Sequence, residues 1–272
     1  MKAFAARGAR IALVTLVAFA LLALLAPWCL PDPNATPDPI GARLLGPSFA
    51  HPLGTDALSR DLFARLAHGG AISLQVGLLA AFIATVVGGL VGLSAGAVGG
   101  VLDQLLMRIT DALATVPRAF ALLFVVAAWP ELPLGAFILL LGITGWYAVA
   151  RIVRAEAVRL MATDALTAAR ALGAGRARII FRHLLPNVAG QLAVATALGV
   201  GEAMLLEAGL SFLGAGVRPP TASWGGMIHD GKDVLLTAPW ATLAPGLALT
   251  AVVLAANRLG DALRDAFDPR TR

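Results

Sequence analysis

Hydrophobic residues are concentrated in six long segments that are separated by polar stretches. A helix needs roughly 20 apolar residues to cross the hydrocarbon core of a membrane. The segments that come close to or exceed this length are Ile11–Ala26, Leu74–Val98, Ile109–Trp129, Leu134–Ala150, Val188–Leu210 and Ala241–Leu259. Three long polar stretches interrupt them, at Pro31–Gly70, Arg151–Asn187 and Ser211–Trp240. We therefore expect an all-α integral membrane protein with six transmembrane helices.

The first apolar segment also has some features of a secretory signal. Three basic residues precede a short apolar run, as in the leader of an exported protein. However, Trp28 stands just before Cys29, where a lipoprotein signal has glycine or alanine, and five further spans follow. We expect this segment to remain as an uncleaved helix.

The composition excludes an ordinary soluble enzyme and a disordered chain. Of the 272 residues, 58% are hydrophobic and 14% are charged, whereas soluble domains are about 45–50% apolar and about 25% charged. The chain also contains 29 glycines, and Gly88, Gly92, Gly96 and Gly100 recur every four residues. Small residues at this spacing let two membrane helices approach closely. We expect these glycines to lie on one helix face and to serve helix packing.

The basic residues indicate an orientation in the membrane. If the amino terminus is cytoplasmic and the six spans alternate, 15 of the 21 basic residues fall on the cytoplasmic side. The five on the external side are Arg43, Arg60, Arg65, Arg218 and Lys232, and Arg118 lies inside a span. This bias follows the positive-inside rule, so both termini are expected in the cytoplasm. Because topology accounts for most of the net charge of +5, nucleic-acid binding is disfavoured.

Few residues have a pattern typical of chemistry. Gly226–Asp233 resembles a phosphate-binding loop, but it ends in a carboxylate in place of the serine or threonine that would bind magnesium. The four histidines have no metal-ligand spacing, and Cys29 is the single cysteine. We therefore expect no catalytic, cofactor-binding or metal-binding residues. Glu202 and Glu207 in the fifth span are candidates for lining a pathway, since ionisable groups in membranes usually face a bundle interior or a wet path.

The polar stretch Arg151–Asn187 is the most informative. The segment Asp164–Gly173 reads as a short helix, with an acid at its start and glycine at its end. A hydrophilic loop of this length in a hydrophobic protein is typical of a docking site for a cytoplasmic partner. A basic helix lying on anionic lipid would have the same composition, so composition leaves both interpretations open.

The motifs of this loop and its surroundings resemble those of a known family. Ala168-Ala169, Gly173 and Leu185-Pro186 are spaced as in the EAA loop of permease subunits of binding-protein-dependent ABC importers. Further segments resemble the C-type permeases of the dipeptide, oligopeptide and nickel branch: His51–Asp56, Arg60-Asp61, Ile72–Leu74, Met107–Asp111, Arg182–Asn187, Glu207–Gly214, Pro219-Pro220, Ser223–Gly225, Pro239-Trp240 and Gly260–Pro269. These matches follow the family order from residue 51 to residue 269.

The resemblance implies a type I ABC importer (MetI-like) permease fold. It divides the chain into residues 1–70, an amino-terminal transmembrane helix with an external loop, and residues 71–272, a permease domain of five helices. Within that domain the cytoplasmic coupling loop covers about residues 151–187. The residues implied to couple to the ATPase are Thr167, Ala168, Ala169, Arg170, Leu172, Gly173, Leu185 and Pro186.

The resemblance also implies the partners and the location. A homologous second permease would complete the pathway, two cytoplasmic ATPases would bind ATP and magnesium, and an extracytoplasmic binding protein would deliver the solute. The chain itself would be a multi-pass protein of the bacterial cytoplasmic (inner) membrane and would bind no cofactor. Dipeptides, oligopeptides, nickel chelates, glutathione and opines are all carried within this branch, and the sequence does not distinguish among them.

The chain departs from the family pattern at several positions. Thr167 stands in place of the glutamate of the EAA motif, and His183 in place of its isoleucine. Ser59 replaces the usual glycine before Arg60-Asp61, Ala71 replaces an arginine, and Ala97-Val98 replaces two tyrosines. Two other functions remain open from the residues themselves: a membrane scaffold without a pathway, and an ion-driven carrier. Against a carrier, the chain shows no duplicated halves of the inverted-repeat kind.

Overall fold

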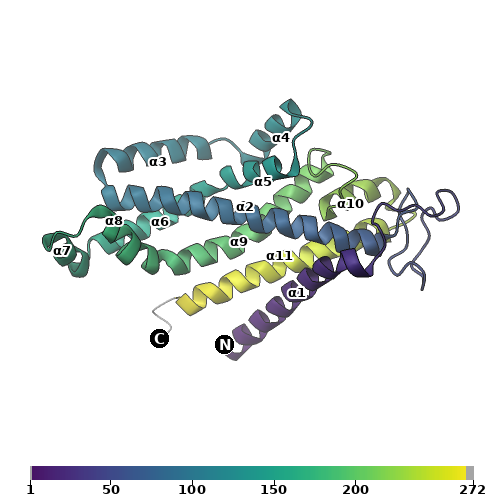
Figure 1. The fold of residues 1–272 in the computed structure, drawn as a ribbon, viewed down its shortest axis with the longest axis horizontal. Coiled ribbons are helices and arrows are strands. Elements are labelled where there is room, and N and C mark those ends of the chain that lie inside the picture. The colour runs from purple at the N-terminus through teal and green to yellow at the C-terminus, as the bar shows by residue number, and fades with distance from the viewer. Residues whose placement is uncertain (1, 268–272) are drawn as a thin grey trace. The chain divides into compact units, whose positions relative to one another are not determined.

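The computed structural model describes residues 2–267 (Figure 1). Within this range the chain is helical and forms no strand, apart from an isolated bridge between Thr55 and Asp61. The elements are α1 (Lys2–Cys29), α2 (Leu62–Val98), α3 (Gly100–Ala114), α4 (Arg118–Ala128), α5 (Leu134–Ile143), α6 (Trp146–Met161), α7 (Asp164–Ala171), α8 (Arg176–Ile179), the π-helical turn η1 (Ile180–Leu184), α9 (Leu185–Phe212), α10 (Trp224–Gly231), the 3₁₀ turn η2 (Lys232–Val234) and α11 (Trp240–Phe267). Arg270, Arg272 and the end of the Gly260–Pro269 motif lie outside the described residues.

Five helical segments are long and apolar enough to cross a membrane, and they coincide with five of the six predicted spans. They are Arg7–Cys29, Leu62–Val98, Leu134–Met161, Arg176–Phe212 and Trp240–Phe267. The helices extend past the predicted apolar runs because helical backbone hydrogen bonding does not stop where the hydrocarbon ends. Helix α2, for example, has 37 residues, which makes it about 55 Å long, well above the roughly 30 Å of the hydrocarbon core. It also runs through residue 70, where the sequence predicts a domain boundary, and that boundary stays a prediction.

The remaining predicted span, Ile109–Trp129, is wrong as a single straight helix. The chain breaks between α3 and α4, and the two helices are bent by 75°. Pro117 lies at the break. Proline has no amide hydrogen and disfavours the helical conformation of the residue before it, so the helix ends at Ala114 and restarts at Arg118. If this bent pair counts as one span, the total among the described residues reaches the predicted six.

The chain forms two compact units. The first unit contains the chain up to Leu78 together with Leu123–Leu134 and Val200–Leu259. The second unit contains Leu79–Leu122, Gly135–Gly199 and the described residues from Gly260 onwards.

Trp224 is at the centre of the core of the first unit. Its side chain is 1% exposed, and its indole nitrogen donates to the carbonyl oxygen of Leu66 at 2.9 Å. The backbone amide of Trp224 donates to the hydroxyl of Ser73 at 3.0 Å, and the ring of Phe19 meets the indole edge-on with centroids 5.4 Å apart. This residue therefore joins the start of α10 to α2 and α1.

The glycine stripe packs α2 against α6 in the second unit. A β-carbon built at Gly88 would lie 2.6 Å from Cβ of Val149, and one built at Gly92 would lie 2.5 Å from the carbonyl oxygen of Ala150. At Gly96 it would lie 2.5 Å from Cβ of Ala157. The predicted packing role is confirmed for these three residues. Gly100 is an exception, because α2 ends at Val98 and Gly100 is the first residue of α3. It has a φ of 59°, and no atom lies within 4 Å of a β-carbon built there.

Arg118 occupies the break between α5 and α6. Because the amide of Gly145 bonds to Gly142, the carbonyl oxygen of Leu141 loses the partner that a continuous helix would supply. The Arg118 guanidinium replaces it, with Nη2 donating to that oxygen at 2.6 Å and Nε donating to the hydroxyl of Thr144 at 3.2 Å. This charge inside a predicted span therefore stabilises an irregular stretch of backbone.

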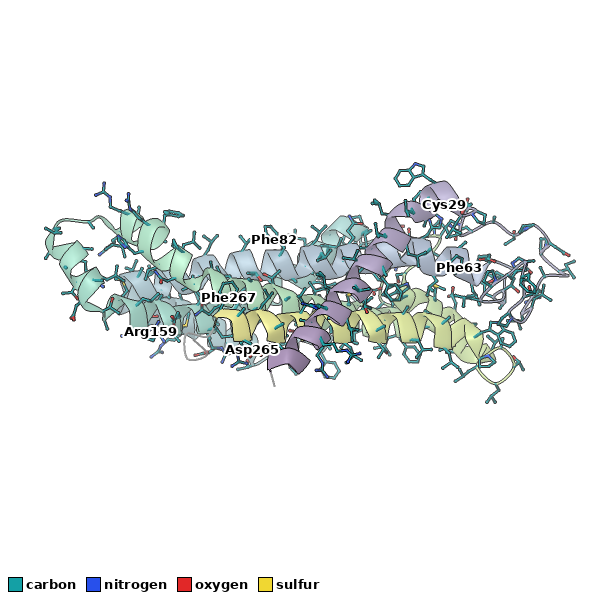
Figure 2. All side chains as sticks on the ribbon, turned by 90° about the horizontal axis from the view of Figure 1, so that it is seen from below. Cys29, Phe63, Phe82, Arg159, Asp265 and Phe267 are labelled. Atoms are coloured by element: carbon teal, nitrogen blue, oxygen red, sulfur yellow. The ribbon has the colours of Figure 1, made fainter. Side chains whose placement is uncertain are left out.

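Many large apolar side chains face outward, as expected for a protein whose solvent is lipid. Phe82 on α2 is 60% exposed, and Trp28 at the end of α1 is 75% exposed, next to the exposed Cys29 (Figure 2). A soluble protein rarely exposes apolar surface on this scale. Together with the five candidate spans, this identifies a multi-pass membrane protein.

The contact at Gly92 gives a testable prediction. In Gly92→Ala the new methyl group would also lie 2.8 Å from Cβ of Val153, so α2 and α6 must separate. We expect the substitution to lower stability by about 1–3 kcal/mol, measured as a lower thermal unfolding temperature of the purified protein in detergent. Gly135→Ala is the matched control, because nothing lies within 4 Å of that position. Equal stability of the two variants would contradict the packing role.

Candidate functional site

The predicted coupling loop is a compact helical structure in the second unit. Helix α6 leads into α7, which is followed by α8, the π turn η1 and the start of α9 (Figure 1). Only short turns separate these elements. The stretch predicted as a polar loop is therefore mostly helical.

Helix α7 confirms the short helix predicted at Asp164–Gly173. Asp164 in the first turn and Arg170 in the last turn both suit the helix dipole. After the helix, Gly173 has a φ of 81°. Its amide donates to the carbonyl oxygen of Arg170 at 2.9 Å, and the amide of Ala174 donates to that of Ala169 at 3.0 Å. These two bonds form a Schellman motif, which favours glycine at this position.

One face of α7 is anchored to the helices around it. Leu166 is 5% exposed and belongs to a hydrophobic cluster with side chains from α2, α6, α8, η1 and α9. The other buried members of this cluster are Leu93, Val149, Val153, Ala157, Ile179, Leu184 and Val188. At the other end of the helix, Arg170 donates from Nη2 to the carbonyl oxygen of Met161 at 3.2 Å. Helix α7 is thus packed against the other helices of the second unit.

The other face of α7 is largely exposed. Thr167, Ala168, Arg170 and Gly173 are exposed, Ala169 is half-buried, and Leu172 is 89% exposed. Phe181 in η1 is 65% exposed as well, and the sequence analysis did not single it out. Leu172 and Phe181 therefore expose apolar area on an otherwise polar stretch of the chain.

Leu185 and Pro186 lie at the start of α9 and shape it. Proline has no amide hydrogen, so Pro186 cannot make the helical bond to the residue four positions earlier. The chain adopts the π turn η1 instead, in which the amide of Leu185 donates to the carbonyl oxygen of Ile180. Asn187 then donates from its side chain to the carbonyl oxygen of His183 at 2.6 Å. Leu185 packs against the cluster around Leu166, whereas Pro186 is exposed.

Glu202 and Glu207 of α9 lie in different environments in the first unit. Glu202 is exposed, whereas Glu207 is completely buried. Oε1 of Glu207 accepts hydrogen bonds from Ser211 at 2.7 Å and from Ser223 at 2.9 Å. Ser223 also caps α10, by accepting from the amide of Gly226 at 3.1 Å. Glu207 thus ties the end of α9 to the start of α10.

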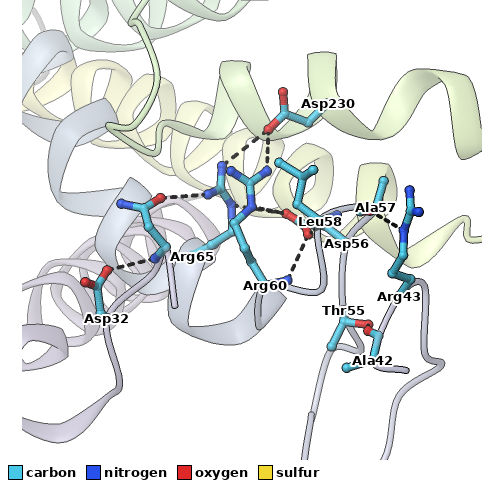
Figure 3. Close-up of polar contacts among 11 residues, drawn as sticks. Asp32, Ala42, Arg43, Thr55, Asp56, Ala57, Leu58, Arg60, Arg65 and Asp230 are labelled. Atoms are coloured by element: carbon cyan, nitrogen blue, oxygen red, sulfur yellow. Dashed lines mark hydrogen bonds and ion pairs between the residues drawn. The ribbon is translucent and has the colours of Figure 1, made fainter. Parts of the chain in front are cut away.

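A second polar site, which the sequence analysis did not predict, lies in the first unit (Figure 3). Arg60 donates from Nε to Asp56 at 2.6 Å and from Nη2 to Asp230 at 3.0 Å. Arg65 donates to the same oxygen of Asp230 at 3.3 Å and to the side chain of Asn34 at 3.1 Å. Asp230 is 165 residues or more from both arginines along the chain, so no spacing in the sequence could have revealed this network.

Asp61 of the motif Arg60-Asp61 and the preceding Ser59 form the turn that leads into α2. Asp61 caps α2 by accepting from the amide of Ala64 at 2.8 Å, and its other oxygen lies 2.7 Å from Nδ1 of His51. Ser59 has a φ of 62°, which favours glycine. Its hydroxyl is buried without a hydrogen-bond partner among the described residues. This is the position where the family pattern usually has glycine.

The sequence resembling a phosphate-binding loop does not form one. Its residues lie in α10 and the turn η2, and no strand precedes them in the part of the chain that the structure describes. Within residues 2–267 no group of three or more histidine, cysteine, aspartate or glutamate side chains is arranged to hold a metal ion.

The chain is similar to permeases of several bacterial transport systems. Residues 88–272 match the family model described as the binding-protein-dependent transport system inner membrane component. A Brucella suis protein named as a peptide transport system permease is 41% identical over 98% of this chain and 89% of its own length. The nickel transport system permease protein NikC of Escherichia coli is 40% identical over 96% and 93%. The dipeptide transport system permease protein DppC of Alkalihalophilus pseudofirmus is 37% identical over 96% and 86%.

Ser59 offers a stabilising substitution. A left-handed conformation costs a non-glycine residue about 1–2 kcal/mol, and a buried hydroxyl without a partner adds to this cost. These two gains in stability are partly offset, because ordering a flexible glycine on folding costs about 0.5–1 kcal/mol of conformational entropy. We expect Ser59→Gly to raise stability by about 1 kcal/mol, measured as a higher thermal unfolding temperature in detergent.

The control for Ser59→Gly is the replacement of a glycine, Gly54, by alanine. This residue has a φ of 78° and lies against Trp240, so Gly54→Ala should lower the unfolding temperature. A lower unfolding temperature for Ser59→Gly would show that the left-handed conformation at this position costs nothing.

Proposed function

Because the chain belongs to the family of binding-protein-dependent transport system inner membrane components, we propose that it forms half of the translocation pathway of an ATP-driven importer. The predicted membership in the peptide and nickel branch of ABC importer permeases is confirmed by the family match and by the named relatives. Within that class, the solute would be a peptide or a related small molecule, such as a nickel chelate, glutathione or an opine.

The proposed coupling element is α7, which would sit in a groove on a cytoplasmic ATPase. The observation that carries this proposal is the contrast between its two faces. Leu166 anchors one face in the second unit, whereas Leu172 is 89% exposed on a short helix with small neighbours. The small side chains of Ala168 and Ala169 would allow the partner surface to approach closely.

The anchoring of α7 supports a mechanical role. The cluster around Leu166 includes Leu93 of α2, Val153 of α6 and Val188 of α9. A push on α7 would therefore move together the parts of these three helices that belong to the second unit. Densely packed side chains transmit such displacement with little compression, as rigid-body switching requires. Hydrolysis itself would take place on the ATPases.

The departure at Thr167 is compatible with this role. Its hydroxyl donates to the carbonyl oxygen of Thr163 at 3.1 Å, which also accepts from the amide of Thr167 at 3.0 Å. A glutamate would present a charge at the same exposed place. We propose that the coupling here depends on the apolar Leu172 more than on a charge at position 167.

The proposed assembly contains four further subunits. They are a second, homologous permease, two cytoplasmic ATPases that bind ATP and magnesium, and an extracytoplasmic solute-binding protein. This arrangement requires both termini and α7 on the cytoplasmic side of the inner membrane, and the basic residues of the loop support that orientation. We expect this chain to bind no cofactor.

ATP dependence separates this proposal from an ion-driven carrier and from a scaffold without a pathway. Uptake into proteoliposomes should require the partner ATPases, and an inactivating substitution in the ATPase site should abolish it. Uptake that follows a proton or sodium gradient without any ATPase would favour the carrier. If the assembled complex takes up no solute at all, the scaffold is favoured.

Gly173 gives the first test of the coupling role. In Gly173→Val a β-branched residue must adopt a φ of 81°, which is a strained conformation. The turn after α7 should shift, and Leu172 should move with it. We expect uptake to be abolished although the protein is inserted normally, as judged by membrane fractionation.

Gly175→Val is the matched control for Gly173→Val. Gly175 has a φ of −67°, and no atom lies within 4 Å of a β-carbon built there. Transport should therefore continue in this variant. Normal uptake by correctly inserted Gly173→Val would refute the coupling assignment.

Leu172 gives a second test that does not alter the backbone. Leu172→Asp places a charge on the exposed apolar surface, so we expect weaker retention of the ATPases and at least about tenfold lower uptake, because burying an unpaired carboxylate at an interface is costly. The measurement is copurification of the ATPases with the permease. Leu236→Asp is the control, because Leu236 is 98% exposed and lies on the expected external side. Equal loss of ATPase in both variants would argue against a specific contact.

A further inference from the structure

The first unit contains a cavity of about 420 Å³ that none of the functions described above uses. It lies between the loop that follows α9 and helix α10, and Arg65 of α2 forms part of its wall. Cavities of roughly 300–1,000 Å³ are typical of small-molecule sites. By the expected topology this cavity faces the external side of the membrane.

The hydrogen bonds around Glu207 leave the two serines of this cavity without a free proton. Ser211 and Ser223 both line the cavity, and both hydroxyls donate to Oε1 of Glu207. Glu207 itself lies behind them and is completely buried. A ligand must therefore find its hydrogen-bond donors elsewhere in the wall.

The charges of the cavity favour an anion. Of the residues that line it, all of them within the described range, Asp230 alone carries a carboxylate, and two arginines hold that carboxylate at 3.0 and 3.3 Å. Arg65 is likewise satisfied, by Asp230 and Asn34. The guanidinium of Arg218 is exposed in the wall and makes no ion pair or hydrogen bond with a described residue. One positive charge is left over in a wall that also contains Thr221.

We propose that this cavity is a subsite for the carboxylate of the transported solute and that Arg218 binds it. A guanidinium offers two parallel donors that match the two oxygens of a carboxylate. Peptides, glutathione and opines all carry such a group. The proposal rests on the proposed function, since it names the part of the solute that the permease recognises.

The test is protection of a cysteine placed in the cavity wall. Cys29 is the single cysteine of the chain, so Cys29→Ser with Val217→Cys leaves one thiol on this chain, in the wall of the cavity. The complete importer, without binding protein or ATP, is labelled with a methanethiosulfonate reagent. N-acetyl-alanyl-alanine should slow the labelling of this chain, whereas its carboxamide, which has the same size and no charge, should not.

Adding Arg218→Gln should raise the half-protecting concentration of the acid by about tenfold or more, as expected for the loss of a charge-assisted hydrogen bond. Arg43→Gln is the matched control, since it removes the same charge from the expected external side at a residue outside the cavity. Equal protection by acid and amide, no protection by either, or unchanged protection in Arg218→Gln would overturn the proposal. Protection that appears only when the binding protein is added would also overturn it, because an acidic side chain of that protein would then be the occupant.

This assay involves neither ATP nor transport. A negative result therefore leaves the proposed function intact, whereas absence of ATP-driven uptake by the complete importer would refute the proposed function itself.

Discussion

The constraint on which this fold depends is that backbone amides and carbonyls must find partners wherever the chain is surrounded by lipid. Long helices meet this requirement over most of the sequence, and the two breaks meet it in different ways. At the break between α5 and α6, Arg118 supplies the donor that Leu141 loses. At Pro117 the chain turns by 75°, and α4 begins directly after the proline. Arg118 therefore supplies a hydrogen-bond donor at one break, and Pro117 marks the other break, where one helix ends and the next begins.

The same helices provide the mechanical link that a coupling element needs. Gly88, Gly92 and Gly96 bring α2 and α6 into backbone contact, and the cluster around Leu166 fastens α7 to both and to α9. Close packing of this kind explains why α7 can be short and still be held in place. It leaves Leu172 and Phe181 as exposed apolar side chains, which is the arrangement expected of a surface that a partner covers.

In the first unit, charged and polar side chains join elements that are distant along the chain. Two aspartates and two arginines join α10 to the segment before α2 and to the start of α2. Glu207 joins α10 to the end of α9 through two serines. Asp230 is paired with Arg60 and Arg65, whereas the guanidinium of Arg218 in the cavity wall makes no ion pair with a described residue. Arg218 is therefore the positive group of the cavity wall that we propose for a ligand.

The sequence by itself determined the class of this protein, five of its six spans to within a few turns, and the short helix at Asp164–Gly173. These features depend on local composition and on residues such as Gly173, whose backbone conformation only glycine adopts easily. The tertiary structure decided the rest. The pairing of Asp230 with Arg60 and Arg65, the exposure of Phe181 and the partner of Arg118 all join residues distant along the chain or depend on which helix face is covered. Local pattern contains no information on such contacts, because they arise only when the helices have packed.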